Sequence, residues 1–305
     1  MLVFTHPACL DHHPGPGHPE SPARLRVVLD ALHAAFPDAL DWRIAPPARF
    51  GDLARVHERE LIESILQPQS EALRILDMDT TMSPGSAQAA LHAAGAGVAA
   101  VDAVMLKADT RAFCAVRPPG HHATHDTAMG FCLFNNIAVA AAYARDHYGL
   151  ERIAIVDFDV HHGNGTQAIF EHEPRAAYFS THQSGLFPYT GTMRERGAGN
   201  VCNILLPPGS GSFRFRNAWA EDLLPQIGAF QPQLLLVSAG FDGHMRDPQA
   251  DLMLETADFA WLSAELVRIA RQHGGGRVVS MLEGGYDLDA LAECSVAHVQ
   301  ALRRP

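Results

Sequence analysis

The chain has 305 residues, of which 47% are hydrophobic and 19% charged, a composition that suits a large globular core and excludes a disordered or fibrous protein. Its 23 Lys and Arg against 34 Asp and Glu give a net charge of −11, and an acidic chain is repelled by nucleic-acid phosphates and anionic membrane surfaces. We therefore expect neither nucleic acid nor a membrane as a partner.

The cysteines and the N-terminal residues bear on the cellular compartment. The five cysteines are scattered and include no Cys-x-x-Cys pair, so we expect neither a disulfide framework nor a zinc site made of thiolates. The segment from Met1 to Pro7 lacks the basic and long apolar regions of a signal peptide. These features favour a cytoplasmic protein. The 18 histidines are unusual, and histidine binds metals and transfers protons near neutral pH.

Short apolar runs recur along the chain at intervals too long for hairpins, and most of them do not alternate with polar residues. Continuous apolar runs are typical of strands that are buried on both faces of a sheet. Strands are therefore predicted at residues 2–4, 112–116, 153–158, 177–180, 201–205, 234–238 and 278–282.

Segments with helical periodicity lie between these strands. The first follows Ser21 and Pro22, which suit a helix N-cap and first turn, and its apolar residues from Leu25 to Phe36 share one face. Further helices are predicted at residues 86–106, 136–147, 213–227, 256–272 and 288–302. Because strands and helices alternate, we expect an α/β fold in which a parallel sheet has helices on both faces, as one domain over residues 1–305.

The uncharged stretch from Thr80 to Val101 is long enough to span a membrane. Its apolar residues are mostly alanine, interspersed with glycine, Gln88 and His92, which makes the stretch too weakly hydrophobic for lipid. We expect a tightly packed internal helix here.

Residues capable of chemistry follow four of the predicted strands. In parallel α/β sheets, ligands bind beyond the carboxyl ends of the strands, so these residues should meet at one edge. The segments are RPPGHHA at 117–123, DFDVHHGNG at 157–165, SAGFD at 238–242 and EGGYD at 283–287. Each alone has an ordinary explanation, such as a turn or a helix N-cap. Together they predict an active site.

The second and third of these segments predict a metal site. Asp159 and His161 stand two residues apart in an extended segment and project from the same side, and Asp242 can approach from a neighbouring strand end. Two carboxylates and one imidazole leave coordination positions open, as catalytic zinc sites do, and iron(II) accepts the same ligands. Zinc would polarise a carbonyl group and acidify a water molecule.

A general base and a hydrogen-bond donor complete the predicted site. His121 and His122 are the candidates for the base, with Asp157 as the orienting partner of one and Asn164 as that of the other. Tyr286, on a turn with two glycines, is the candidate donor opposite the metal.

These motifs resemble those of the zinc-dependent histone deacetylase family, which includes bacterial acetylpolyamine amidohydrolases and acetoin-utilisation proteins. The resemblance also covers HPESPARL at 18–25, GFCLFNN at 130–136 and STHQ at 180–183, and it runs to the last predicted helix. Asn164 stands where class I members have an aspartate, so the chain looks more like the class II branch. The resemblance implies the arginase/deacetylase fold, with a mainly parallel eight-stranded sheet, and hydrolysis of an N-acyl amide.

The resemblance also implies roles for the site residues. One zinc ion would be held by Asp159, His161 and Asp242. His122 would be the general base, and His121 its electrostatic partner or proton donor. Tyr286 would hold the carbonyl oxygen of the substrate.

Further residues match the family's substrate tunnel and a second ion. Phe131 and Phe187 would form the two aromatic walls of a narrow acyl-lysine tunnel, with Gly130 contributing backbone. A potassium ion behind the zinc is implied, with Asp157 and Ser180 as its side-chain contributors.

The sequence leaves the substrate open between acyl-lysine in proteins and small acylated amines such as acetylpolyamines. Gln249 stands near the position where polyamine-specific relatives can have an acidic gatekeeper, and a neutral amide attracts a polycation less. Arginase-like urea release would need two manganese ions and more carboxylates than this site offers. An inactive acyl-lysine binding module would lack His122 or Tyr286, and both are present.

Overall fold

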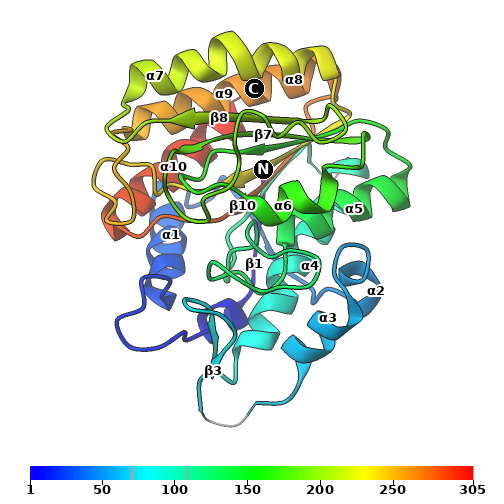
Figure 1. The fold of residues 1–305 in the computed structure, drawn as a ribbon, viewed down its shortest axis with the longest axis vertical. Coiled ribbons are helices and arrows are strands. Elements are labelled where there is room, and N and C mark those ends of the chain that lie inside the picture. Colours follow the sequence, from blue (N-terminus) through cyan, green and yellow to red (C-terminus); the bar gives the residue numbers. More distant parts are fainter. Residues whose placement is uncertain (70–71, 108, 305) are drawn as a thin grey trace.

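The computed structural model describes residues 1–69, 72–107 and 109–304, and its centre is an eight-stranded parallel sheet between two layers of helices (Figure 1). The strand order is β2-β1-β5-β10-β9-β6-β7-β8. The strands are β1 (Leu2–Thr5), β2 (Asp41–Ile44), β5 (Arg111–Cys114), β6 (Ile153–Asp157), β7 (Ala176–Gln183), β8 (Val201–Leu206), β9 (Leu234–Ala239) and β10 (Val278–Leu282). The predicted fold class is confirmed.

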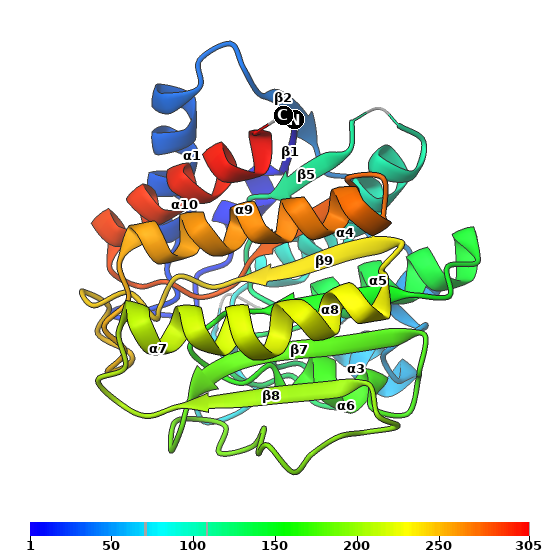
Figure 2. The same cartoon turned by 90° about the horizontal axis from the view of Figure 1, so that it is seen from above.

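Two groups of helices cover the sheet (Figure 2). One face is covered by α9 and α10, against which α1 and α8 pack, and the other by α4 and α5. The helices are α1 (Pro22–Ala35), α2 (Phe50–Leu53), α3 (Arg59–Leu66), α4 (Ser86–Met105), α5 (Asn136–Tyr148), α6 (Asn164–Phe170), α7 (Ser212–Asn217), α8 (Leu224–Phe230), α9 (Thr256–His273) and α10 (Leu288–Arg303). A 3₁₀ turn spans Pro7–Leu10, and a small hairpin pairs β3 (Arg74–Ile75) with β4 (Thr81–Met82).

The central strands are apolar along their whole length because helices cover both of their faces. Every residue of β6, β9 and β10 is buried, which explains why the predicted strands showed no alternation. The edge strand β2 was not among the predicted runs. It is a four-residue strand with mostly exposed side chains, including Ile44 at 69% exposure, so it shows no apolar signal.

The alanine-rich helix α4 is the one helix, within the part of the chain that the structure describes, that is long and apolar enough to cross a membrane. It packs on β1, β5, β10 and α5, as predicted for an internal helix. Its small residues permit close contact: a Cβ at Gly95 would overlap the backbone of residues 46–48, and one at Gly97 would press on Ala140 and Met281. The segment predicted as one helix at 213–227 is helical throughout, but a π-helical turn at Ala218–Leu223 separates α7 from α8.

Sheet order explains how the four predicted active-site segments meet. They follow β5, β10, β9 and β6, which are consecutive neighbours at the centre of the sheet. The register aligns their carboxyl ends, since Asp157 pairs with Ser238 and Leu282 pairs with Ala239. Residues that are far apart in sequence therefore come together at one edge.

Candidate active site

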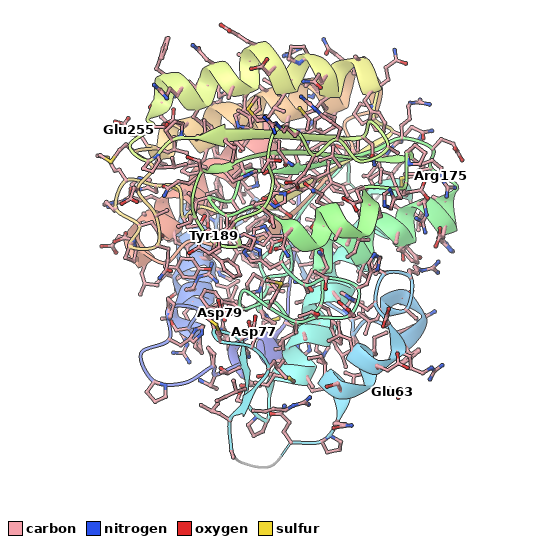
Figure 3. The ribbon with its side chains drawn as sticks, in the orientation of Figure 1. Glu63, Asp77, Asp79, Arg175, Tyr189 and Glu255 are labelled. Carbon is pink, nitrogen blue, oxygen red and sulfur yellow. The ribbon has the colours of Figure 1, made fainter. Side chains whose placement is uncertain are left out.

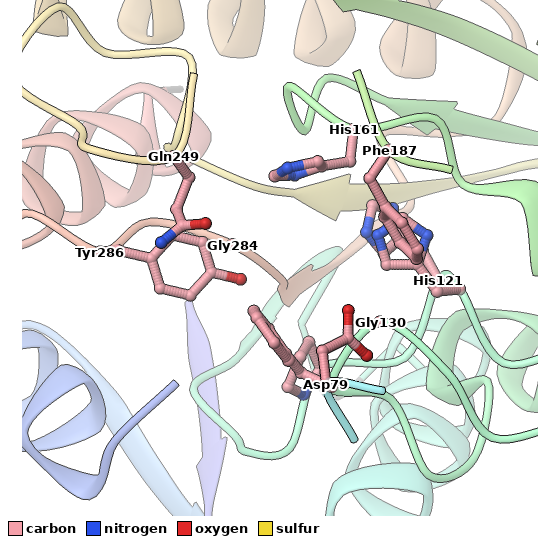
Figure 4. A pocket seen from close by; sticks show the side chains of 11 residues that line it. Asp79, His121, Gly130, His161, Phe187, Gln249, Gly284 and Tyr286 are labelled. Atoms are coloured by element: carbon pink, nitrogen blue, oxygen red, sulfur yellow. The ribbon is translucent and has the colours of Figure 1, made fainter. Parts of the chain in front are cut away.

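A narrow pocket opens at this edge of the sheet (Figure 4). It holds about 90 Å³ of free space, which suits a slender chain and not a bulky ligand. Its lining consists of Asp79, Pro119, His121, His122, Gly130, Phe131, His161, Phe187, Gln249, Gly284 and Tyr286. The pocket therefore brings together the predicted base candidates, the tyrosine, the two aromatic walls and one predicted metal ligand.

The three predicted metal ligands converge beneath the pocket. Donor atoms of Asp159, His161 and Asp242 all lie within 4.8 Å of one another, and the imidazole Nδ1 is 3.1 Å from a carboxylate oxygen of each aspartate. Two glycines leave room for this cluster, because a Cβ at Gly240 would overlap Asp159, and one at Gly284 would overlap both carboxylates.

Backbone amides orient the two carboxylates before any ligand binds. Val160 N–H donates to Asp242 Oδ1 at 2.9 Å, and Gly284 N–H donates to Asp159 Oδ2 at 2.8 Å. The oxygens that face His161 are thereby directed into the cluster. Both aspartates are buried, and two negative charges so close together favour a cation or a proton between them.

Electrostatics in this cluster favour a bound cation. Burial raises the pKa of Asp242 to about 7, and the nearby charge of Asp159 adds to the effect. Burial alone would lower the pKa of His161, but hydrogen bonds to the two carboxylates raise it to about 10. Two carboxylates and one imidazole are ligands that zinc prefers, so these residues fit a zinc ion.

The paired histidines have different partners. His121 Nδ1 lies 3.0 Å from Asp157 Oδ2, whereas His122 Nδ1 lies 2.8 Å from Asn164 Oδ1. The sequence left this pairing open, and the structure assigns the carboxylate to His121 and the amide to His122. The two rings are adjacent, with centroids 4.0 Å apart.

The environment drives the pKa values of these histidines in opposite directions. Burial opposes the charged form of His121, but Asp157 and Asp159 outweigh it and raise the pKa well above its usual range. For His122, burial and the neighbouring His121 lower the pKa well below that range. A neutral imidazole next to a cationic one is the arrangement that general base and electrostatic partner require.

Both predicted aromatic walls, Phe131 and Phe187, line the pocket, and Phe187 is labelled in Figure 4. The Phe187 ring meets His122 edge to face at 5.1 Å between centroids, and the Phe131 ring meets Tyr286 in the same way at 5.9 Å. Gly130 has a φ of +57°, and a Cβ there would overlap the imidazole of His122. Glycine at 130 is therefore required for the histidine and the wall to fit together.

Tyr286 follows Gly284 and Gly285, and its ring lines the pocket. Burial raises the pKa of the phenol well above its ordinary value, so the hydroxyl keeps its proton and can donate a hydrogen bond. The Arg24 guanidinium lies 4.7 Å from the centroid of the same ring.

The residues named for a potassium ion already have protein partners. The Asp157 carboxylate accepts hydrogen bonds from the Tyr178 hydroxyl at 3.0 Å and the Asp159 N–H at 3.2 Å, besides its contact with His121. Ser180 Oγ lies 2.9 Å from His182 Nδ1. The potassium site stays a prediction.

Asp79 and His18 were not predicted as site residues. Asp79 lies on the turn between β3 and β4 (Figure 3), and it lines the pocket (Figure 4). His18 Nε2 is 3.1 Å from the carbonyl oxygen of Asp79, and its ring meets Phe131 edge to face at 4.7 Å. Two-residue strands have no periodicity to detect, so only the fold shows that this turn reaches the pocket.

Three comparisons relate the chain to known proteins. A family model of the histone deacetylase domain matches residues 18–302. A histone deacetylase-like amidohydrolase from Pseudomonas aeruginosa is 40% identical, over 94% of this chain and 77% of its own length. The polyamine deacetylase HDAC10 from Homo sapiens is 39% identical, over 93% of this chain and 44% of its own length. The crystal structure of the HDA15 HD domain matches with a TM-score of 0.93 at 33% identity, covering 99% of this chain and 87% of that one.

Proposed function

The chain belongs to the histone deacetylase family of amidohydrolases, and on that premise we propose that it is a zinc-dependent deacylase that removes acetyl or related acyl groups from lysine side chains. One observation supports this proposal above all others. The ligand triad Asp159, His161 and Asp242 lies at the base of a narrow pocket whose lining includes two adjacent histidines, His121 hydrogen-bonded to a carboxylate and His122 to an amide.

The residues of this chain have complementary roles in amide hydrolysis. Asp159, His161 and Asp242 would hold the zinc, which would polarise the substrate carbonyl and lower the pKa of a water molecule. His122 accepts a proton from the attacking water, and the cationic His121 stabilises the negative charge that develops nearby. The Tyr286 hydroxyl donates a hydrogen bond to the carbonyl oxygen as that oxygen gains charge. The C–N bond then breaks, and the proton held by the histidine pair passes to the leaving amine.

The shape of the pocket supports an extended acyl-amine substrate. Phe131 and Phe187 supply flat apolar surfaces to the lining of a narrow pocket, which favour an unbranched alkyl chain. The lining also includes the neutral Gln249 and the acidic Asp79, which are both partly exposed. Either side chain can contact the part of the substrate that extends beyond the alkyl chain.

An acetylated polyamine is the second candidate substrate. The carboxylate of Asp79 favours a cationic amine, and one relative is named a polyamine deacetylase. The proposed lysine substrate and this alternative differ in what extends out of the pocket, which is a peptide in one case and a charged amine in the other.

A substrate panel tests the proposal. Zinc-loaded enzyme would be assayed for carboxylate release from acetyl-lysine peptides, longer acyl-lysine peptides, acetylputrescine and acetylspermidine. We expect the highest kcat/KM on an acyl-lysine peptide. A preference for the polyamines would assign the second candidate, and hydrolysis of none of these amides by the metal-loaded enzyme would refute the deacylase function.

A further inference from the structure

The turn that bears Tyr286 lies just beyond the last hydrogen bonds between β9 and β10. The ladder extends past the strand ends through Glu283 N–H to the Ala239 carbonyl at 3.0 Å and Phe241 N–H to the Gly284 carbonyl at 3.0 Å. After Gly284 no further hydrogen bond of this ladder joins the described residues that follow β9 and β10. The backbone of Tyr286 therefore needs another partner to hold it over the pocket.

The Asp247 carboxylate supplies that partner. Asp247 lies in the loop between β9 and α9 and is 6% exposed. Its Oδ2 accepts hydrogen bonds from Tyr286 N–H at 2.6 Å and from Asp287 N–H at 3.1 Å. Its Oδ1 accepts one from Gln249 N–H at 3.0 Å. One buried side chain thus binds both the tyrosine turn and the pocket residue Gln249.

An opposite charge holds the carbonyl side of the same turn. Arg24 Nε donates to the Gly285 carbonyl at 2.5 Å, and Nη2 donates to the Glu283 carbonyl at 2.5 Å. The turn is therefore fixed between a cation at its carbonyl groups and an anion at its N–H groups. Because Gly285 has a φ of +124° and glycine restricts the backbone little, these two contacts fix the backbone from which the phenol extends.

We propose that Asp247 is a positioning residue that holds Tyr286 in its catalytic orientation and couples that orientation to the pocket rim through Gln249. This inference rests on the proposed deacylase function, since Tyr286 is the hydrogen-bond donor of that reaction. Asp247 itself does not line the pocket, so it acts through the tyrosine turn and not on the substrate.

An asparagine at this position tests the geometry with little change of volume. In Asp247→Asn, one oxygen can still accept from Tyr286 and Asp287, but the new NH₂ group then faces the N–H of Gln249. If the amide group is turned the other way, its NH₂ faces the N–H groups of Tyr286 and Asp287. In either case one set of hydrogen bonds is lost, and a displacement of about 1 Å at a reacting group lowers kcat by about 100-fold. We expect kcat to fall by about 10- to 100-fold while KM changes little.

A double-mutant cycle with Tyr286→Phe separates positioning from general damage. If Asp247 acts through the tyrosine hydroxyl, Asp247→Asn should lower kcat by less than about 3-fold when that hydroxyl is already absent. A residue with a merely structural role would give the same loss in both backgrounds. Equal losses would overturn the inference.

Asp109 offers a matched control at the far end of the sheet. Its Oδ1 also accepts from two consecutive backbone N–H groups, those of Thr110 at 2.6 Å and Arg111 at 3.1 Å. Asp109→Asn should therefore disturb a similar contact without changing kcat. A loss in this variant equal to that in Asp247→Asn would show that the effect is general destabilisation.

Hydrogen exchange gives a readout that does not depend on activity. In the unmodified protein, the backbone N–H groups of Tyr286 and Asp287 should exchange slowly, because Asp247 accepts hydrogen bonds from both. This measurement does not need the Asp247→Asn variant, so it remains possible if that variant fails to fold. Fast exchange of both amides would overturn the inference. If these backbone N–H groups are protected but the enzyme hydrolyses no acylated substrate, the proposed deacylase function is refuted. The role of Asp247 in that reaction is then refuted as well, although its contact with the turn is confirmed.

Discussion

The imidazole of His122 is hydrogen-bonded through Nδ1 to the side-chain oxygen of Asn164, at 2.8 Å. Asn164 Nδ2 lies 3.4 Å from the His122 carbonyl oxygen, a contact that only the NH₂ group can make as a donor. The amide oxygen therefore faces the ring, Nδ1 bears the hydrogen, and Nε2 is left as the basic nitrogen. The hydrogen bond to Asn164 favours the charged form, but burial and the neighbouring His121 outweigh it, so the pKa of His122 stays well below its usual range.

Replacing this amide with a carboxylate should shift the pH dependence of activity. In Asn164→Asp, the new charge favours the imidazolium form and raises the pKa of His122. The base must be neutral to accept a proton, so a higher pKa means that activity begins to fall at a higher pH as the solution is acidified. The measurement is the acidic limb of the kcat/KM profile. Asn164→Ala serves as the control without the charge, and an acidic limb that stays in place in Asn164→Asp would contradict this role for His122.

Gly130→Ala should damage catalysis more than stability. Its added methyl group would overlap the His122 ring, and the positive φ of +57° adds backbone strain. We expect kcat to fall by about 10- to 100-fold through displacement of the base. Gly149 has a similar φ of +63° with open space around it, so Gly149→Ala shares the strain without the contact. Equal kcat values for the two variants would show that the glycine at 130 does not serve the histidine.

The sequence predicted those parts of the site that follow buried strands. The segments 157–165 and 238–242 come directly after apolar runs, so their place at the sheet edge followed from the rule for parallel sheets. The turn that bears Asp79 lies between two-residue strands and has no such signal. The contact of Asp247 with the Tyr286 backbone joins residues 39 apart in the chain, and only the tertiary fold brings them together.

Stability should depend on pH through a buried histidine outside the site. His298 is buried, with Ser263 Oγ at 2.6 Å and Ser280 Oγ at 2.8 Å, and burial lowers its pKa from 6.5 to about 3. At pH values between about 3 and 6.5, His298 is protonated in the unfolded chain and neutral in the folded chain. This contribution to stability is complete above pH 6.5 and is lost as the pH falls toward 3, at up to about 1.4 kcal/mol per pH unit.

Urea unfolding between pH 4 and pH 7 measures this effect. His298→Asn should flatten the dependence of the unfolding free energy on pH, because it removes one titrating group. His172 is exposed, with 87% of its side chain accessible, so His172→Asn should leave the slope unchanged. An unaltered slope in His298→Asn would mean that this histidine is not held neutral in the fold.

Zinc should stabilise the protein only when the triad is complete. A ligand that binds the folded state raises the free energy of unfolding by about 2.7 kcal/mol when its concentration is 100 times Kd. Asp242→Asn keeps an oxygen for the Val160 N–H but lacks the second carboxylate. In thermal unfolding, added zinc should raise the Tm of the original chain and leave the Tm of the variant unchanged. An equal rise in both would place the metal elsewhere.

The most direct test of the account is a metal titration of the chelator-treated enzyme, with acetate release from an acetyl-lysine peptide as the readout. A single site made of Asp159, His161 and Asp242 predicts that activity rises linearly with added zinc and stops rising at about one equivalent per chain. Full acetate release by enzyme that contains almost no metal would contradict the central claim, as would a requirement for two equivalents.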